Sequence, residues 1–296
     1  DNPAAAKVEF EANGVKFEVT NGYRAKALNL DATKPLVLGA LTDIKSFIPQ
    51  NATNLKLYFE EFKKAKVQGV LVAGDSGEKI DALKPVFEAL AKEGLPIFVI
   101  MGNRESKADY VKAMADVQAT AKNLVNMNAV RVVDFGAATL ISIAGYYDAN
   151  YIHNPPGCPY TGKQIEELKA LVAAAKSPVI LFSHGPMRGT GPDAIDNAVE
   201  AGNVGDPALA ALINESKIPF GVFGNIHEAG GKAVGPDFKT VIKQNTPSPA
   251  LYLHPGAGDS DPWKLNDGSL SRGMAGILTI EGGKASYKII RAAAPK

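Results

Sequence analysis

The sequence contains few of the residues that mark disulfide-bonded, membrane-spanning or nucleic-acid-binding proteins. Its single cysteine, Cys158, excludes an internal disulfide bond. No run of about 18 apolar residues occurs, so no segment is predicted to span a membrane. The net charge is only +1, and no lysine- or arginine-rich run occurs. This charge pattern argues against a nucleic-acid partner.

Histidine is also scarce, with only four in the chain: His153, His184, His227 and His254. Any site that depends on imidazole must draw on these four.

The start of the chain bears on where the protein works. The sequence begins at Asp1 rather than at methionine, and residues 1–6 are mostly small. Such a start is typical of a mature protein after removal of a signal peptide, which predicts export to the periplasm or out of the cell. Trimming of the chain for another reason is the alternative.

Length and composition suit a globular protein. The chain has 296 residues, of which 46% are hydrophobic and 21% charged, enough to bury a large core. Apolar residues alternate through 8–19 on both sides of Asn13-Gly14, a strong signal for a β-hairpin. No repeat or linker follows. We therefore predict an N-terminal β-hairpin extension over 1–34 and a single domain over 35–292.

The remaining pattern predicts an α/β fold. Continuous apolar runs alternate with segments of helical spacing up to residue 122, which is typical of parallel strands covered on both faces. From residue 129 a hairpin, a helix and further strands follow. We predict a four-layer α/β sandwich of two mixed sheets flanked by helices. The predicted strands are 35–41, 69–73, 96–101, 130–135, 138–144, 178–182, 219–223, 250–253, 275–280 and 285–290, and the predicted helices are 54–66, 80–92, 108–122 and 162–175.

Polar residues follow five of these predicted strands. The ends of neighbouring strands in an open α/β sheet converge, and ligands bind there. The five fragments are Thr42-Asp43-Ile44-Lys45, Gly74-Asp75, Gly102-Asn103-Arg104-Glu105, Ser183-His184-Gly185 and Gly224-Asn225-Ile226-His227-Glu228.

In this order the fragments resemble the motifs of the calcineurin-like metallophosphoesterases. The family pattern is Asp-x-His, Gly-Asp, Gly-Asn-His-Asp/Glu, a lone His, and Gly-His-x-His. Lys45, Arg104 and Asn225 stand where the pattern has histidine, so the motifs are degenerate. The resemblance covers roughly residues 36–292.

The resemblance implies a two-metal site and a role for each matching position. Asp43, Asp75 and His227 would hold the first metal, with Lys45 in place of its other histidine. Asp75, Asn103 and His184 would hold the second, with Asn225 in place of its other histidine. We expect either one divalent ion, namely manganese, iron or zinc, or none.

The two introduced cations change this chemistry. A protonated Lys45 cannot ligate a metal, and Arg104 cannot exchange protons near neutral pH but can grip a phosphate with two hydrogen bonds. One hypothesis is that Lys45 and Arg104 pair with Asp43 and Asp75 and leave a metal-free site.

Candidate roles follow. Arg104, Lys45 and Asp75 are the candidates for catalysis. Arg104, Asn103, Asn225 and Arg188 are the candidates for ligand binding. The tyrosines at 146, 147 and 151 are expected to pack their loop rather than to line a cleft.

Two functions remain open at this point. The first is a degenerate protein that lacks two-metal hydrolysis and binds a phosphorylated small molecule or a protein partner through the old cleft. The second is an active but altered phosphoesterase that hydrolyses a phosphomonoester or phosphodiester with a single metal.

Overall fold

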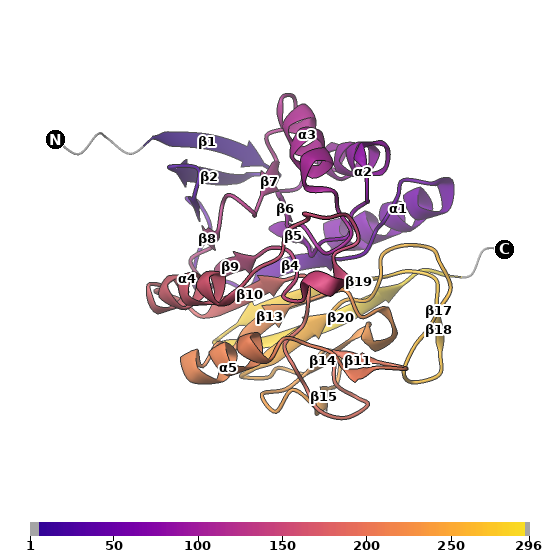
Figure 1. Cartoon of the computed structure of the whole chain (residues 1–296). Helices are drawn as coiled ribbons and strands as arrows, with labels where there is room; N and C mark the ends of the chain where they lie inside the picture. Colours follow the sequence, from indigo (N-terminus) through magenta and orange to yellow (C-terminus); the bar gives the residue numbers. More distant parts are fainter. Residues whose placement is uncertain (1–5, 294–296) are drawn as a thin grey trace.

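The computed structural model of the chain describes residues 6–293 and consists of two β-sheets packed face to face, with helices on their outer faces (Figure 1). The start on which export was predicted, residues 1–6, lies outside the described residues except for Ala6. Within 6–293, no helix is long and apolar enough to cross a membrane.

The smaller sheet supplies three of the five motifs. Its six strands run in the order β20-β19-β4-β5-β6-β7, with β4 to β7 parallel and β19 and β20 antiparallel to their neighbours. The strands are β4 (Leu36–Leu41), β5 (Gly69–Val72), β6 (Ile97–Val99), β7 (Leu124–Asn126), β19 (Met274–Glu281) and β20 (Lys284–Arg291).

The larger sheet supplies the other two motifs. Its order is β1-β2-β3-β8-β9-β10-β13-β16-β14-β15, and the central strands β9, β10, β13 and β16 are parallel. The strands are β1 (Lys7–Ala12), β2 (Val15–Thr20), β3 (Arg24–Ala27), β8 (Val132–Asp134), β9 (Thr139–Ile143), β10 (Val179–Ser183), β13 (Phe220–Val222), β14 (Lys232–Val234), β15 (Val241–Ile242) and β16 (Leu251–His254).

Helices cover the outer face of each sheet and complete four layers. Helices α1 (Pro49–Lys64), α2 (Ile80–Lys92) and α3 (Lys107–Gln118) pack on the smaller sheet, and α4 (Gly162–Ala173) and α5 (Pro207–Ser216) pack on the larger one. Two 3₁₀ turns, η1 (Ala149–Tyr151) and η2 (His227–Ala229), and two small strand pairs, β11 (Asn197–Ala198) with β12 (Gly202–Asn203) and β17 (Trp263–Lys264) with β18 (Leu270–Ser271), lie in the connections.

The alternation of side chains along each strand explains why both faces are apolar. In β4, Leu38 and Ala40 enter the core between the sheets, whereas Leu41 faces the helices. Because successive side chains of a strand point to opposite faces, a strand buried on both sides needs an uninterrupted apolar run. The N-terminal strands join the same core, since Phe17 of β2 is fully buried against Phe98 and Phe135.

The predicted fold class is confirmed: the protein is α/β, with two mixed sheets and flanking helices. The hairpin at Asn13-Gly14 is present, and β3 then joins it to β8 of the larger sheet. Helix α1 begins at Pro49, five residues before the predicted start, since proline suits the first helical turn. The sequence pattern missed α5, as well as β3, β7, β14 and the strands of two residues. These strands have at most four residues, which is too few for a periodic pattern to reveal.

Candidate functional site

The five motif loops meet where strands of both sheets end. Asp43 and Asp75 follow β4 and β5 of the smaller sheet, while His184 and Asn225 follow β10 and β13 of the larger sheet. Backbone hydrogen bonds join these loops, from Asp43 N to Gly74 O at 3.0 Å and from Gly224 N to His184 O at 2.7 Å. The fold therefore brings together residues far apart in the chain, such as Asn225 and Asp43, which are 182 positions apart and joined by a bond from Asn225 N to Asp43 Oδ2.

The backbone of this region adopts conformations that side chains rarely take. Asp43, Lys45, Asp75 and Asn225 have positive φ values of 54°, 63°, 52° and 69°. Aspartate and asparagine tolerate this left-handed region, but lysine seldom occupies it, and such residues often cluster at functional sites. Position 74 requires glycine, because a Cβ atom there would lie only 2.7 Å from His184 Nδ1 and would clash with it.

Asp43 is buried and receives hydrogen bonds on both of its carboxylate oxygens. Its Oδ1 lies 2.9 Å from Nε2 of His227, and its Oδ2 accepts from the Thr42 hydroxyl at 2.6 Å and the Asn225 backbone at 3.1 Å. Burial favours the neutral acid, but the attraction of His227 and these hydrogen bonds outweigh it and hold the pKa of Asp43 below its usual range.

Asp75 is equally buried but has fewer stabilising neighbours. Its Oδ1 accepts from the backbone amides of Asn103 at 3.1 Å and Arg104 at 3.0 Å. Burial raises the pKa of Asp75; His184 opposes that rise and the nearby charge of Asp43 adds to it. A further positive charge near Asp43 and Asp75 would favour the ionised form of both carboxylates.

His184 presents a hydrogen-bonding conflict that points to a cation. Its Nδ1 lies 2.6 Å from the carbonyl oxygen of Ala73, so Nδ1 must carry a proton. In the neutral imidazole, Nε2 then directs a lone pair toward Asn103 Oδ1 at 3.1 Å and Asp75 Oδ1 at 3.4 Å. The side-chain amide of Asn103 cannot flip to present its nitrogen to His184, because that nitrogen donates to Tyr151 O at 2.9 Å. Three acceptor atoms thus face one another, and either a second imidazole proton or a metal ion would resolve the conflict.

The residues present fit a divalent metal ion. Asp43, Asp75 and His184 are buried, and each offers a ligand atom within 4.8 Å of the other two. Asn103 adds an amide oxygen beside His184. Carboxylate and amide oxygens with one imidazole nitrogen suit manganese, iron or zinc. This group, Asp43, Asp75, Asn103 and His184, is called the acceptor cluster below.

The prediction that Lys45 neutralises an aspartate of the cluster is wrong. The Lys45 ammonium lies 2.6 Å from Asp259 Oδ2, and 4.6 Å from the centre of the Trp263 ring. Asp43 already has its hydrogen-bond donors, whereas Asp259 is 2% exposed and is brought next to the site by a bond from its backbone amide to Asp43 O. Lys45 therefore forms its ion pair with a carboxylate that lies outside the five motifs.

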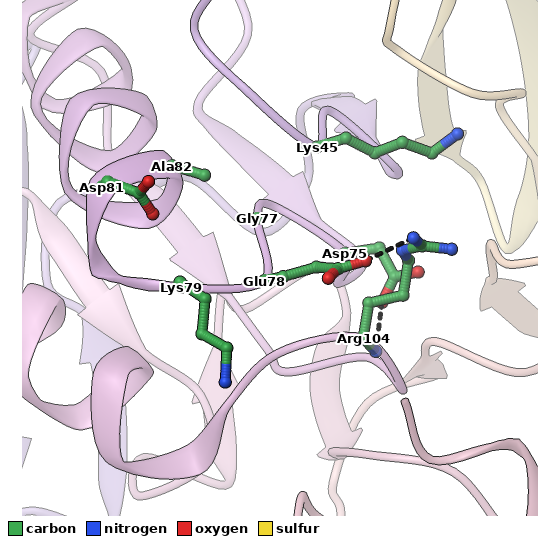
Figure 2. Close-up of a pocket in the computed structure, with 8 residues that line it drawn as sticks. All are labelled: Lys45, Asp75, Gly77, Glu78, Lys79, Asp81, Ala82 and Arg104. Carbon is green, nitrogen blue, oxygen red and sulfur yellow. Dashed lines mark hydrogen bonds and ion pairs between the residues drawn. The ribbon is translucent and has the colours of Figure 1, made fainter. Parts of the chain in front are cut away.

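The corresponding prediction for Arg104 is also wrong. Its guanidinium pairs with Glu78, while only its backbone amide contacts Asp75, as Figure 2 shows. Glu78 lies in the loop between Asp75 and α2, closer to the guanidinium than the buried aspartates. The two cations leave Asp43 and Asp75 free of side-chain ion pairs with lysine or arginine in the described structure.

A hollow of about 300 Å³ opens beside the cluster at Asp75 (Figure 2). It is called the charged hollow, because cationic and anionic side chains share its wall. Its lining consists of Lys45, Asp75, Gly77, Glu78, Lys79, Asp81, Ala82 and Arg104.

The remaining predicted residues lie around the cluster in different ways. Asn225 borders a second hollow, and the ring of His227 lies tilted against that of Trp263, with ring centres 4.1 Å apart. Arg188 donates to Gly205 O at 2.8 Å and lines neither hollow. Burial lowers the pKa of His254 to about 3, so this histidine is neutral near pH 7.

Sequence reasoning missed the structural role of Glu105. This fully buried carboxyl accepts from the backbone amide of Ser76 at 2.9 Å and from that of Gly102 at 2.8 Å. It thereby joins the loop that carries Asp75 to the loop that carries Asn103. Its place as the last residue of the third motif was the available signal. No such signal marked Asp259, Glu78 or Trp263, because these residues lie outside the motifs.

Comparison with known proteins supports the fold. No family model matches the chain, and no curated protein matches it. Among solved structures, the protein TT1561 of Thermus thermophilus has a TM-score of 0.59 at 13% identity and covers 86% of this chain and 99% of its own. A dimetal phosphatase from Danio rerio has a TM-score of 0.53 at 12% identity, with coverages of 87% and 99%.

A purple acid phosphatase from yellow lupin is also similar, with a TM-score of 0.53 at 11% identity. The match covers 93% of this chain and 54% of the lupin chain. At these identities the likeness establishes a shared fold, which is the metallophosphoesterase fold, and not a shared activity.

Removal of the Glu105 carboxyl tests its structural role. Glu105→Ala leaves two buried amides unpaired and is expected to lower the free energy of unfolding by about 2–5 kcal/mol. Glu105→Gln keeps an acceptor oxygen and should cost less. Urea unfolding measures both, with the exposed Glu215→Ala as the control. Equal stabilities of Glu105→Ala and Glu215→Ala would refute the role.

Proposed function

We propose that the protein binds one divalent metal ion at the acceptor cluster and uses it to hold the phosphate of a phosphorylated small molecule, without two-metal hydrolysis. The observation that carries this proposal is the set of acceptor atoms facing Nε2 of His184. A second proton on His184 is the competing explanation. Two buried carboxylates within ligand distance supply the negative charge that a divalent ion would need, and metal content distinguishes the two explanations.

Each residue of the cluster has a distinct part in this proposal. Hydrogen bonds from His184 to Ala73 O and from Asn103 to Tyr151 O fix the orientation of their ligand atoms. Asp43 and Asp75 supply negative charge. A divalent ion bound there would act as a Lewis acid toward a phosphoryl oxygen.

The first metal position of the family is less suited to an ion. Nε2 of His227, the imidazole that would serve this position, is instead directed at Asp43 Oδ1 at 2.9 Å. Lys45 cannot coordinate a metal while protonated, and its ion pair with Asp259 keeps a positive charge near this position. These contacts support one ion rather than two.

Phosphate would enter the charged hollow. Asp75 belongs both to the cluster and to the hollow lining, so a ligand there can reach the metal position. Arg104 lines the same hollow and has five N–H donors, more than its pairing with Glu78 uses. Lys45 and Lys79 add positive charge to the wall. A phosphate on a protein partner remains the alternative source of the anion.

The metal prediction concerns His184. The purified protein, expressed with manganese, iron and zinc available, is expected to carry about one divalent ion per chain. His184→Ala removes the imidazole ligand and should lose most of it. Elemental mass spectrometry measures the content, with the exposed His153→Ala as the matched control. Wild-type protein without metal after that treatment would overturn the one-metal proposal.

The phosphate prediction concerns Arg104. Arg104→Gln removes a charged donor from the hollow and should weaken the binding of inorganic phosphate about ten- to hundredfold, the range expected for charge-assisted hydrogen bonds. Isothermal titration calorimetry with manganese present measures the affinity. Arg188→Gln, which alters an arginine outside both hollows, should change it less than about threefold. Equal losses in the two variants would exclude a specific role for Arg104.

A second candidate function is slow hydrolysis with the single metal. The shared position of Asp75 in the cluster and in the charged hollow favours it, because the phosphate could then contact the ion directly. This candidate predicts manganese-dependent release of phosphate from a phosphomonoester or phosphodiester that disappears in His184→Ala and persists in Glu215→Ala, which alters an exposed residue outside both hollows. No release from wild type holding both metal and phosphate would favour the first candidate.

A further inference from the structure

We propose that the second hollow beside the cluster binds an uncharged aromatic ring, so that the ligand is a phosphate ester or phosphonate carrying such a ring. This proposal rests on the proposed function for the position of the phosphate. The hollow is called the tyrosine hollow. It has a volume of about 220 Å³ and lies next to Tyr146 and Tyr151.

The lining of the tyrosine hollow differs in kind from that of the charged hollow. Four aliphatic side chains, Ala198, Ala201, Val204 and Ile226, share its wall with the two tyrosines, and the polar residues Asn103, His153 and Asn225 complete it. None of its lining residues is lysine, arginine, aspartate or glutamate. A wall of this kind favours an apolar group without charge, because burying a charge without a partner is costly.

Tyr151 leaves an aromatic surface open to a ligand. Tyr146 is 3% exposed and packs against Tyr147 and His184, whereas Tyr151 is 53% exposed. The two rings of Tyr146 and Tyr151 stand nearly perpendicular, at 85°, with centres 6.3 Å apart. A planar guest could add to this arrangement by edge or face contact. Both Tyr146 and Tyr151 line the hollow, contrary to the expectation that these tyrosines only pack their loop.

The tyrosine side of the hollow is fixed to the acceptor cluster. Asn103 donates to Tyr151 O at 2.9 Å and accepts from the His153 backbone at 2.9 Å, and Asn154 donates to Arg104 O at 2.7 Å. Asn103 lines this hollow and Arg104 lines the charged one. One ligand could therefore place its phosphate and its ring on adjacent residues of the same motif.

The aliphatic side is fixed independently. The hydroxyl of Tyr147 donates to Val204 O at 2.9 Å. The carboxylate of Asp196 accepts from the amides of Gly189 and Gly205 and from the side chain of Asn203, and so closes the segment that carries Ala198. These contacts form the hollow without a bound ligand. Its volume is below the range of about 300–1,000 Å³ usual for whole ligands, which suits a single ring of a larger molecule.

The test compares two non-hydrolysable ligands of equal charge, so turnover cannot affect it. With manganese present, calorimetry measures the binding of methylphosphonate, phenylphosphonate and inorganic phosphate. Wild type is expected to bind phenylphosphonate about tenfold more tightly than methylphosphonate, through burial of the ring.

Two substitutions assign the preference to the hollow. Ala198→Phe fills it and should bring the phenyl-to-methyl ratio close to one, with phosphate affinity changed less than about threefold. Val199→Phe is the matched control, because Val199 is 65% exposed and does not line the hollow. Tyr151→Ala removes the exposed ring and should also lower the ratio, which keeps the test valid if Ala198→Phe does not fold.

The outcomes separate this inference from the proposed function. Phosphate binding with equal affinities for the two phosphonates would overturn the ring subsite alone. Phenylphosphonate binding that depends on Ala198 and Tyr151, without phosphate binding, would support the subsite and refute the phosphate site. Absence of binding by all three ligands would overturn both. A tenfold preference unchanged in Ala198→Phe and Tyr151→Ala would place the ring elsewhere and refute the inference.

Discussion

The hydrogen bond from His184 Nδ1 to the carbonyl of Ala73 connects the two sheets where the acceptor cluster lies. His184 follows β10 of the larger sheet, and Ala73 follows β5 of the smaller one. The bond fixes which imidazole nitrogen is protonated, and therefore which one faces Asp75 and Asn103. The cluster exists only while the sheets keep their relative position, so the core between them and the proposed chemistry depend on each other.

The sequence predicted much of the fold because burial on two faces leaves a readable pattern. The run Leu36 to Leu41 is apolar throughout because its side chains enter two different cores. The motif residues were also identifiable, since each follows such a run. Their convergence followed from the topology of parallel strands.

The partners of Lys45 and Arg104 could not be predicted in the same way. Asp259 is more than two hundred residues from Lys45, and its approach depends on how a loop after β16 folds against Asp43. Glu78 lies much closer to Arg104 in the sequence. A long side chain can nevertheless reach several carboxylates, and its partner depends on their distance and exposure. The hydrogen bond between Asp43 and His227 could not be predicted either, because a sequence motif identifies the residues of a site but not their side-chain rotamers.

The two sides of the tyrosine hollow come from separate segments, and this separation has a consequence for evolution. The side next to Tyr151 is tied to the motif loops, so changes there would disturb the cluster. The side next to Ala198 is closed mainly by Asp196 and by Tyr147. Substitutions at Ala198, Ala201 or Val204 can therefore alter ligand preference while the motif residues stay unchanged. Descendants of this chain could diverge in ligand specificity through that one segment while the residues of the acceptor cluster stay the same.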